Sequence, residues 1–296
     1  MTQRYLSRPY SPTSFPTHFP HSLQNLRPYD PSSDRGFYLQ PRFVNHIDDH
    51  AISELSVFYN DVLPRSGQST DEVGKASRPL PRVLDICSSW VSHIPLGGAQ
   101  GGNTTRKPSA REIGMEVIGI GMNAAELAAN PILSAWVVHD LNQEPDFASV
   151  GPLLEPGRGQ AGQVVSPEDL STPFDAVICN VSIDYLSRPL EIMSSIARAL
   201  RPGGEAYMAI SNRCFPTKVV SPWLEMSTTD RINLVASYFY FAGTPYANGT
   251  PSTAQQGPQP GQLFEGIESL VIVPEGRRED PLWIVRAKKR ADDTPG

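Results

Sequence analysis

Hydrophobic and polar residues alternate along this chain with two periods. From residue 49 to residue 63 apolar side chains recur at helical spacing, which predicts an amphipathic helix with Asp48 or Asp49 at its start. Elsewhere, short apolar runs between turn residues predict strands. The predicted strands cover residues 82–86, 116–120, 135–139, 174–179, 205–210, 268–273 and 282–287. Further helices are predicted in a strand-loop-helix unit at 82–94 and over 124–130, 186–200 and 230–241, with Pro202, Gly203 and Gly204 ending the helix at 186–200.

The order of these elements predicts the fold class. Strand and helix alternate for most of the length, which is typical of a mostly parallel sheet with helices on both faces. The last two strands have no helix between them, so we expect them to pair as a hairpin. The sequence therefore predicts an α/β fold with a doubly wound, mostly parallel seven-stranded sheet and an antiparallel final strand.

Proline and glycine, with 29 and 23 copies, mark the connections. They cluster at 64–81, 97–109, 151–162 and 248–261, which we interpret as surface insertions between elements of the core. Residues 1–29 contain no Asp or Glu and resemble an organelle-targeting segment in part, but their prolines interrupt the helix that such a peptide needs. We therefore predict a poorly ordered tail over 1–36, with a targeting segment as the alternative, and a main domain over 82–290.

Composition and charge exclude several classes of function. The formal net charge of −6 argues against a nucleic-acid partner, because such binding depends on clustered Lys and Arg. The chain has no stretch of about eighteen uncharged apolar residues, so we expect a soluble cytoplasmic protein that does not span a membrane. Three scattered cysteines are too few for a disulfide framework or a paired metal site, and we expect no metal.

Candidate ligand-binding residues follow the predicted strands. In doubly wound sheets, ligands bind outside the carboxyl ends of the strands, near the point where the strand order reverses. The candidates at these ends are Asp85, Cys87, Ser88, Gly121, Met122, Asn123, Asp140, Leu141, Asn142, Asn180 and Ser182, together with residues 211–213.

One pattern indicates a dinucleotide. Gly119, Gly121 and Ala124 satisfy G-x-G-x-x-A, and Asp140 follows about twenty residues later, where a dinucleotide enzyme would bind its ribose. However, this pattern lies on the second predicted strand instead of the first, and its first two glycines fall in the strand or at its end. An NAD(P)-binding oxidoreductase is therefore a lesser alternative.

A longer set of motifs carries a family resemblance. The segments "VLDICSSWVSHIP", "FDAVICNVSIDYL" and "ALRPGGEAYMAISNR", in this order, resemble the class I S-adenosylmethionine-dependent methyltransferases, particularly the type 11 domains, over residues 83–287. The segments "PRFVNHIDDHAISELSVFYNDVLP", "GMNAAELAANPIL" and "SNRCFPTK" are similar to a subfamily whose glycine-rich first loop is replaced in this manner. The resemblance implies S-adenosylmethionine as cofactor and methyl transfer to a small-molecule acceptor.

The resemblance also implies roles for the first three strand ends. Asp85 would lie by the amino-acid tail of the cofactor, with Cys87 and Ser88 in the loop beside it. Gly121 stands where the family usually has an acid for the ribose hydroxyls, and Asn123 is the nearest substitute. Each residue also has an ordinary structural interpretation, since Asp85 and Asn123 could each cap a following helix.

The remaining roles concern adenine, the methyl group and the cover of the pocket. Asp140 would contact the adenine edge, with Leu141 over the ring and Asn142 close by, or be a turn aspartate. Asn180 and Ser182 would face the methyl group, or satisfy their own loop. Residues 37–64 would form a helical lid with Arg42 and His46 directed inward. As possible general bases, His93, Asp184 and Tyr185 are eligible by position only, so no catalytic residue is predicted.

The departures from the family pattern leave a second function open. Without the glycines of the first loop and the ribose acid, the chain could keep the fold and have lost methyl transfer. It would then serve as a binding or regulatory module, or run a different reaction in the same pocket. The sequence predicts neither the acceptor nor the oligomeric state.

Overall fold

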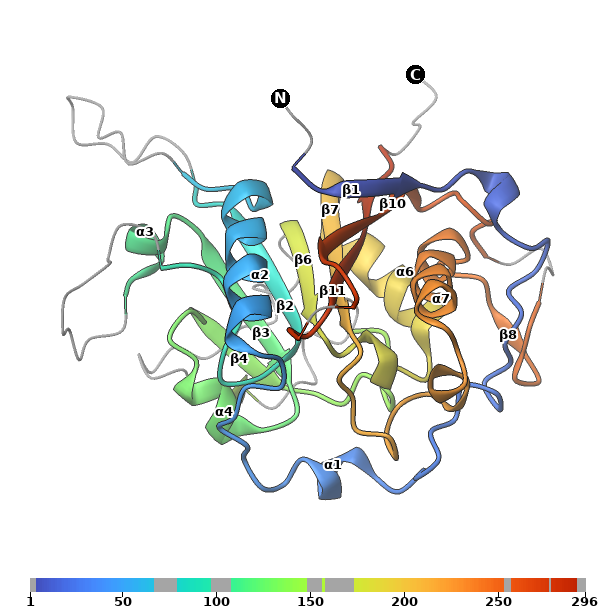
Figure 1. Ribbon diagram of the computed structural model, residues 1–296, viewed down its shortest axis with the longest axis horizontal. Helices are drawn as coiled ribbons and strands as arrows, with labels where there is room; N and C mark the ends of the chain where they lie inside the picture. Colours follow the sequence, from blue (N-terminus) through green and yellow to red (C-terminus); the bar gives the residue numbers. More distant parts are fainter. Residues whose placement is uncertain are drawn as a thin grey trace.

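The computed structural model describes residues 4–66, 79–96, 108–147, 156–157, 173–252, 257–276 and 278–291 (Figure 1). The insertions predicted at 64–81, 97–109, 151–162 and 248–261 lie partly outside these ranges. Within the described part of the chain, no helix is both long and apolar enough to cross a membrane.

A single large sheet organises the molecule. Within the described ranges, its nine strands run in the order β1-β10-β11-β7-β6-β2-β3-β4-β5. Their bounds are β1 (Leu6–Pro9), β2 (Arg82–Ser88), β3 (Glu116–Gly121), β4 (Ala135–Val138), β5 (Pro156–Gly157), β6 (Phe174–Asn180), β7 (Leu200–Ser211), β10 (Phe264–Val273) and β11 (Leu282–Lys289), and a separate ribbon pairs β8 (Tyr246–Ala247) with β9 (Thr250–Pro251). Neighbours from β4 to β7 pair in parallel, and β11 is antiparallel to both β7 and β10. The predicted doubly wound sheet is confirmed, with β1 and β5 added at its edges.

Helices cover both faces of the sheet, as Figure 1 shows. The helices are α1 (Asp34–Phe37), α2 (Asp49–Val62), α3 (Ala110–Ile113), α4 (Ala124–Ala129), α6 (Pro189–Ala199) and α7 (Thr228–Tyr240), with 3-10 turns η1 (Pro12–Ser14), η3 (Ile183–Tyr185) and η4 (Ser221–Leu224). Asp48 caps α2 as predicted, because its side chain accepts from Ala51 N. On one face α2 buries Leu55 and Phe58, while α6 and α7 cover the opposite face.

Two predicted helices differ from the structure for local reasons. Residues 89–96 form an irregular loop, so the helix expected within 82–94 is absent there. Side chains bond to this loop instead, because Asn130 Nδ2 donates to Ser89 O at 2.8 Å and to Ser92 Oγ at 2.9 Å. Helix α6 begins only at Pro189, after the η3 turn, and it ends at Ala199, before the Pro-Gly-Gly sequence that lies inside β7.

Residues 4–36 differ from the predicted poorly ordered tail. Strand β1 pairs with β10 at the sheet edge, Phe15 stacks on Tyr240 with ring centroids 4.3 Å apart, and Leu26 is fully buried. These apolar residues stand singly among prolines, so no periodicity reveals them. The chain then runs along the carboxyl edge of the sheet to α2 (Figure 1), and we call residues 28–47 the strap.

Candidate functional site

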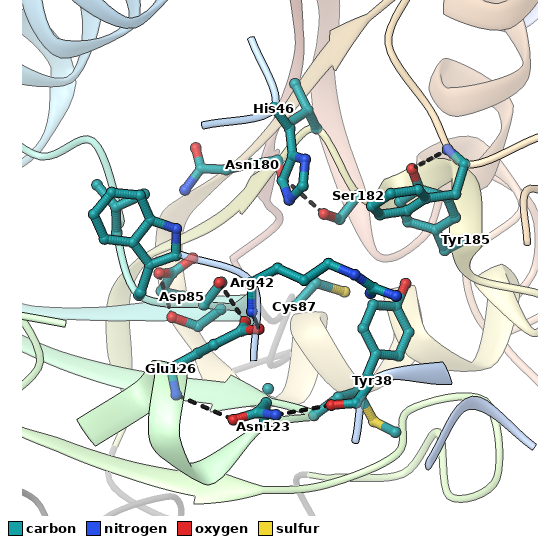
Figure 2. Close-up of a pocket in the computed structure, with 18 of the residues that line it drawn as sticks. Tyr38, Arg42, His46, Asp85, Cys87, Asn123, Glu126, Asn180, Ser182 and Tyr185 are labelled. Carbon is teal, nitrogen blue, oxygen red and sulfur yellow. Dashed lines mark hydrogen bonds between the residues drawn. The ribbon is translucent and has the colours of Figure 1, made fainter. Parts of the chain in front are cut away.

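A cavity of about 270 Å³ opens at the carboxyl ends of the parallel strands. It lies where the strand order reverses, since β3 and β4 extend the sheet on one side of β2 and β6 extends it on the other. All eleven predicted site residues line it, and the strap supplies one wall with Asp34, Tyr38, Arg42, Val44, Asn45 and His46 (Figure 2). The sequence therefore predicted the location of the cavity from strand ends alone.

The predicted helical lid divides into two parts with different positions. The strap lines the cavity, and Arg42 and His46 both contribute to its wall. In contrast, α2 packs on the face of the sheet, because its apolar stripe is buried there. The helix contacts residues of the site through Tyr59, whose hydroxyl donates to Asn180 Oδ1 at 2.6 Å, and through Ser56, whose hydroxyl donates to His93 O at 2.8 Å.

The two strands at the reversal point both end in strained backbone. Cys87, the penultimate residue of β2, has φ +53, and Val181, directly after β6, has φ +41. A non-glycine residue in the left-handed region costs about 1–2 kcal/mol. Such strain persists only where the surrounding structure enforces it, and it clusters at functional sites. The glycine-poor first loop therefore keeps a left-handed turn without glycine.

Asp85 lies on β2 with an unusual hydrogen-bond pattern. Its Oδ2 accepts from the hydroxyls of Ser88 and Ser92, each at 2.7 Å. Its Oδ1 is buried and has no hydrogen-bond partner among the described residues. Burial raises the pKa of Asp85 to about 7, although the two hydroxyl donors act in the opposite direction. Because β2 runs into an irregular loop, the alternative role of Asp85 as a helix cap is wrong.

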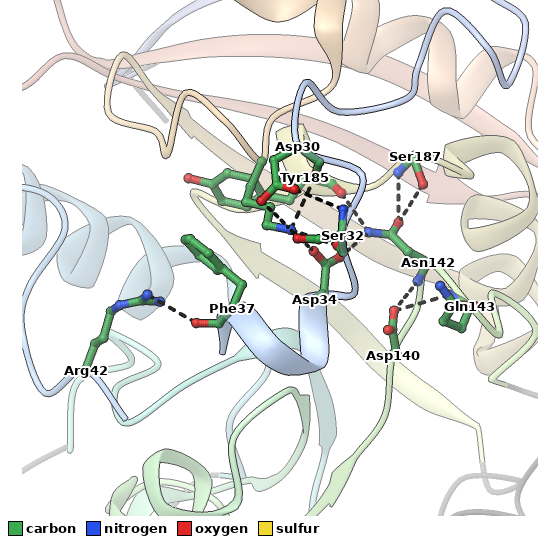
Figure 3. A network of polar contacts seen from close by, with 11 residues as sticks. Asp30, Ser32, Asp34, Phe37, Arg42, Asp140, Asn142, Gln143, Tyr185 and Ser187 are labelled. Carbon is green, nitrogen blue, oxygen red and sulfur yellow. Dashed lines mark hydrogen bonds and ion pairs between the residues drawn. The ribbon is translucent and has the colours of Figure 1, made fainter. Parts of the chain in front are cut away.

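Asp140 shows the same pattern at the end of β4. Its Oδ1 accepts from the backbone N–H groups of Asn142 and Gln143 at 3.0 and 3.2 Å, which is a turn aspartate (Figure 3). Its Oδ2, however, is buried and lacks a partner in the described part of the chain. The turn role and a free acceptor oxygen therefore coexist in one side chain.

Asn123 and Asn142 are fully bonded within the protein. Asn123 Oδ1 caps α4 by accepting from Ala125 N and Glu126 N, and its Nδ2 donates to Tyr38 O and Leu39 O of the strap. Asn142 Nδ2 donates to Asp34 Oδ2 and Tyr185 O, and its Oδ1 accepts from the N–H and hydroxyl of Ser187 (Figure 3). Since each amide has two donors and two acceptor positions, neither side chain has one left for a ligand.

Glu126 lines the cavity and was missed by the sequence analysis. Its side chain accepts from Arg42 N at 2.7 Å and from Ser89 Oγ at 2.6 Å, which leaves lone pairs on both oxygens (Figure 2). The available signal was its place in the first turn of α4, three residues after Asn123. This acid therefore stands close to the place where the resemblance implied that one was lost.

The polar residues at the end of β6 and just after it are held by the protein itself. Asn180 Nδ2 donates to Ser92 O at 3.3 Å, which joins this strand end to the loop after β2. The Ser182 hydroxyl donates to Asn180 O at 2.8 Å, as its structural interpretation predicts. The two loops at the reversal point therefore form one connected wall of the cavity.

The candidate general bases differ in position. His93 lines the cavity with φ +56 and a buried Nδ1 that lacks a partner among the described residues, and burial with nearby His46 lowers its pKa to about 4. Tyr185 also lines it, but its hydroxyl accepts from Phe215 N at 2.8 Å. Asp184 is buried outside the lining, and burial raises its pKa to about 8. Of residues 211–213, only Arg213 reaches the cavity.

An ion-pair network and a backbone hydrogen bond fix the two ends of the strap. Lys218 is buried, its Nζ lies 3.2 Å from Asp30 Oδ2 and 3.3 Å from Asp34 Oδ1, and it donates to Ser32 O at 2.8 Å. Figure 3 shows this network beside Asn142. At the other end, Asp48 N donates to Asp280 Oδ2 at 3.0 Å. The strap therefore lies fixed across the strand ends.

Arg42 reaches across the cavity from the side of Glu126 toward Tyr38 (Figure 2). Its guanidinium carbon lies 4.4 Å from the ring centroid of Phe37 and 5.3 Å from that of Phe215, and Nη2 donates to Phe37 O at 3.2 Å. Aromatic faces attract such a cation. The guanidinium is therefore held by Phe37 of the strap and by Phe215, at the centre of the site.

The dinucleotide pattern does not form a phosphate-binding loop. Gly119 and Gly121 both lie within β3, which pairs with β2 and β4. A Cβ atom on Gly119 would lie 2.6 Å from Leu133 Cδ1, and one on Gly121 would collide with the backbone of Ser88. Both glycines therefore serve close packing inside the sheet, and neither leaves a turn open to a pyrophosphate.

The cysteines and other possible metal ligands are dispersed. Cys87, Cys179 and Cys214 are free thiols. Within the described ranges, His, Cys, Asp and Glu form no group of three or more that could hold a metal ion.

Comparisons with known proteins give a family match and a curated relative. Residues 114–208 match the family described as "Methyltransferase domain". A stretch of 78 residues is 30% identical to the ubiquinone biosynthesis O-methyltransferase of Dechloromonas aromatica (strain RCB), and the match covers 25% of this chain and 34% of the relative. The chain thus spans about a third of the length of that curated relative.

The chain is also similar to solved structures at low sequence identity. A putative S-adenosylmethionine-dependent methyltransferase from Listeria monocytogenes has TM-score 0.40 and 12% identity, over 81% of this chain and 99% of that one. The phosphoethanolamine N-methyltransferase 2 of Haemonchus contortus, solved with S-adenosyl-L-methionine, has TM-score 0.40 and 13% identity, over 81% and 52%. The [4+2]-cyclase SpnF has TM-score 0.43 and 13% identity, over 84% and 86%.

Proposed function

We propose that this chain, whose residues 114–208 match a methyltransferase domain, binds S-adenosylmethionine in the cavity at the strand ends and methylates a small molecule. The cofactor carries an ammonium-carboxylate tail, a ribose diol and an adenine amine. Each of these groups needs a partner of matching chemistry among the residues that line the cavity.

The observation that supports this proposal most is a pair of unsatisfied carboxylate oxygens in one cavity. Asp85 Oδ1 and Asp140 Oδ2 are both buried and without donors among the described residues. Buried acceptors are almost always bonded in native proteins, so each of these two oxygens has room for a donor that the described residues do not supply. They belong to β2 and β4, on either side of β3, and two strand spacings separate the strands by about 10 Å. A long ligand with an amino group at each end fits them.

The ribose diol requires an acceptor between these ends, and we assign it to Glu126. Gly121 has no side chain, and Asn123 is fully bonded to the α4 cap and the strap. Glu126 lies in the first turn of the helix that follows β3, and its carboxylate retains free lone pairs. The acid therefore comes from the helix after the strand instead of the strand end itself.

Bound S-adenosylmethionine supplies an electrophilic methyl group. The contribution of the chain is to bind, orient and shield the reactants. The clamped strap covers the cavity, and Trp90 anchors it from the first loop by donating to Val44 O at 3.2 Å. Since methyl transfer is an in-line displacement, alignment in such an enclosed site can supply most of the acceleration.

One observation favours the alternative, a module that binds the cofactor without transferring the methyl group. Asn123, Asn142 and Ser182 have their hydrogen bonds within the protein, so the chain offers fewer free polar groups to ligands than the strand ends suggest. Methyl transfer from radiolabelled cofactor to any acceptor would exclude this alternative.

A thermal-shift titration tests the binding proposal. The full chain is titrated with S-adenosylmethionine, S-adenosylhomocysteine and NADH. A ligand at a hundred times its dissociation constant stabilises by about 2.7 kcal/mol, and each kcal/mol raises the melting temperature of a large domain by about 2–4 °C. We expect a shift with the two adenosyl compounds and none with NADH. A shift with NADH alone would support the oxidoreductase.

A further inference from the structure

Arg42 carries a positive charge that no acid in the described part of the chain neutralises by an ion pair. Its guanidinium donates to a backbone carbonyl, with Nη2 at 3.2 Å from Phe37 O. Glu126 accepts from the backbone N–H of Arg42 at 2.7 Å, and the guanidinium extends away from it (Figure 2). The other arginine of the cavity, Arg213, pairs with Asp280 at 2.8 Å. Of the two arginines that line the cavity, Arg42 is therefore the one without an acid partner among the described residues.

The neighbouring groups leave this cation uncompensated. The ring centroid of Tyr38 lies 6.0 Å from the guanidinium carbon, and burial raises the pKa of this phenol, so it is neutral at pH 7. Burial lowers the pKa of His46, so its imidazole is mainly neutral as well. Asp34 of the strap pairs with Lys218 instead, with 3.3 Å between Oδ1 and Nζ. The positive charge of Arg42 is therefore available to a ligand of the cavity.

The guanidinium of Arg42 presents N–H groups that a ligand can reach. Nε and Nη1 have no hydrogen-bond partner among the described residues, and neither atom is sealed in the protein interior. Because Arg42 lines the cavity, these donors are open to a ligand there. The donors of a guanidinium lie in one plane, and a carboxylate accepts two of them in parallel. The side chain therefore offers a binding site of carboxylate geometry.

Aromatic rings surround the space beside this guanidinium. Tyr185 follows β6 and Phe215 follows β7, and their ring centroids lie 5.9 Å apart. The ring of His46 contacts Phe215 from the strap, with centroids 5.3 Å apart. All three residues line the cavity, and the guanidinium carbon of Arg42 lies 5.3 Å from the Phe215 centroid. We call these three residues the aromatic compartment, which suits a planar apolar ring because aromatic side chains stack on such groups.

Under the proposed function, the aromatic compartment is left to the acceptor. The cofactor groups are assigned to Asp85 on β2, Glu126 on α4 and Asp140 at the end of β4. Strands β6 and β7 lie on the other side of β2, so the compartment is in the remaining half of the cavity. The cofactor carboxylate shares a carbon atom with its ammonium group and stays near Asp85, whereas the guanidinium of Arg42 points away from Asp85 (Figure 2). The anion that Arg42 binds is therefore assigned to the acceptor.

We propose that Arg42 binds a carboxylate of the methyl acceptor in the aromatic compartment, so that the substrate is an aromatic carboxylic acid. This rests on the proposed function. The guanidinium donates two parallel hydrogen bonds to the carboxylate, and the ring of the acid packs against Phe215 and Tyr185. A carboxylate matches the single charge of Arg42. A phosphate group carries more than one negative charge at pH 7, and Glu126 in the same cavity repels the excess.

The test measures binding of simple probes to the full chain, alone and saturated with S-adenosylhomocysteine. The probes are benzoate, its neutral isostere benzamide, and phenyl phosphate, and titration by saturation-transfer NMR gives their dissociation constants. Arg42→Met removes the charge, and Arg42→Lys keeps the charge without the planar fork. Arg35→Met is the matched control, because Arg35 is an exposed arginine of the same strap. Calorimetric titration with S-adenosylhomocysteine reports whether each variant keeps an intact cofactor site.

We expect the wild-type chain to bind benzoate about ten- to a hundredfold more tightly than benzamide, and more tightly than phenyl phosphate. Arg42→Met should lose this preference for the acid, and Arg42→Lys should retain a smaller one. Both variants should keep the wild-type affinity for S-adenosylhomocysteine, and Arg35→Met should match wild type in every measurement. Benzoate and S-adenosylhomocysteine should bind together, without displacing each other.

Several results would overturn the proposal, and they are distinguishable from a failure of the proposed function. No binding of S-adenosylhomocysteine to the wild-type chain would remove the proposed function, whereas the benzoate titration of the chain alone would still report on the anion site. Equal affinities for benzoate and benzamide, or an unchanged preference in Arg42→Met, would contradict the role of Arg42. Tighter binding of phenyl phosphate than of benzoate would exclude the carboxylic acid class. Displacement of S-adenosylhomocysteine by benzoate, or a large loss of its affinity in both Arg42 variants, would make Arg42 a cofactor ligand.

Discussion

The backbone carbonyl of Ser88 occupies the space into which any side chain on Gly121 would project. The two residues pair across the parallel strands β2 and β3, next to a register shift between Ile86 and Ser88. The glycine-poor first loop and the missing ribose acid are therefore one structural feature. Because the first loop presses its backbone on the end of β3, only glycine fits there, and under the proposed function an acid for the ribose comes from elsewhere.

Gly121→Ala should therefore destabilise the chain. Its Cβ would meet backbone, which cannot rotate away, and overpacking of this kind costs about 1–3 kcal/mol or more. The matched control is Gly36→Ala, because no atom lies within 4 Å of the added Cβ and we expect a change within about 0.5 kcal/mol. Thermal unfolding compares the two variants. Equal melting temperatures would mean that the first loop yields and that the link between these features is absent.

Glu126→Gln tests the assignment of the ribose acceptor. The amide keeps the size of the side chain and can still accept from Arg42 N, but it lacks the charge. Hydrogen bonds to charged groups contribute about 1 kcal/mol more than neutral ones, so we expect affinity for S-adenosylhomocysteine to fall by roughly five- to tenfold. Calorimetric titration gives the affinity, with the exposed Glu225→Gln as control. Unchanged binding would remove Glu126 from the site.

Asn123→Ala should behave differently from Glu126→Gln. Its side chain caps α4 and holds Tyr38 O and Leu39 O of the strap. Loss of such a cap costs about 1 kcal/mol. We expect a lower melting temperature, with less effect on affinity than Glu126→Gln has. The opposite order of effects, with Asn123 controlling affinity, would favour the assignment from the family resemblance.

These two residues show what the sequence could and could not predict. Strand periodicity and polar strand ends were sufficient to find the sheet, its order of elements and the location of the cavity. They could not reveal that Asn123 is bonded to residues 38 and 39, because these contacts join segments that are distant in sequence. The burial of Leu26 was missed as well, because a single apolar residue among prolines shows no helical or strand periodicity. The helix predicted after β2 is absent because Asn130 and Asp85 form hydrogen bonds with residues of that loop instead.

Stability should depend on pH through Asp85. Its pKa is about 7 in the folded protein against an ordinary value of 3.8, so between these values the folded chain holds a proton that the unfolded chain lacks. The free energy of unfolding therefore falls as pH rises from about 4 to 7, and this contribution is constant above that range. Asp85→Asn is neutral throughout, so its stability relative to wild type should rise across this window, by at most about 4 kcal/mol.

Urea denaturation of both chains from pH 4 to pH 8 measures this difference. Asp184 is also buried with a raised pKa, and it contributes to wild type and variant alike, so the difference between them isolates Asp85. A constant difference across the window would show that Asp85 is ionised in the folded protein even at low pH.

Lys218→Met should release one end of the strap. Lys218 is buried, whereas the side chains of Asp30 and Asp34 are 39% and 19% exposed, so loss of the ammonium leaves two carboxylates without their cation and lowers the stability of the chain. We expect faster tryptic cleavage at Arg35 and Arg42 and a lower melting temperature. The exposed Lys288→Met serves as control and should change neither. Unchanged cleavage in Lys218→Met would show that other contacts hold the strap.

Calorimetric titration of the full chain with S-adenosylhomocysteine, for wild type, Asp85→Asn and Asp140→Asn, tests the central claim most directly. Each aspartate has one buried oxygen without a donor among the described residues, and each is assigned to one end of the ligand. A lost hydrogen bond to a charged group costs about 1.5–3 kcal/mol, so each variant should bind about ten- to a hundredfold more weakly, with Glu225→Gln unchanged. Wild-type affinity in both aspartate variants would contradict the account.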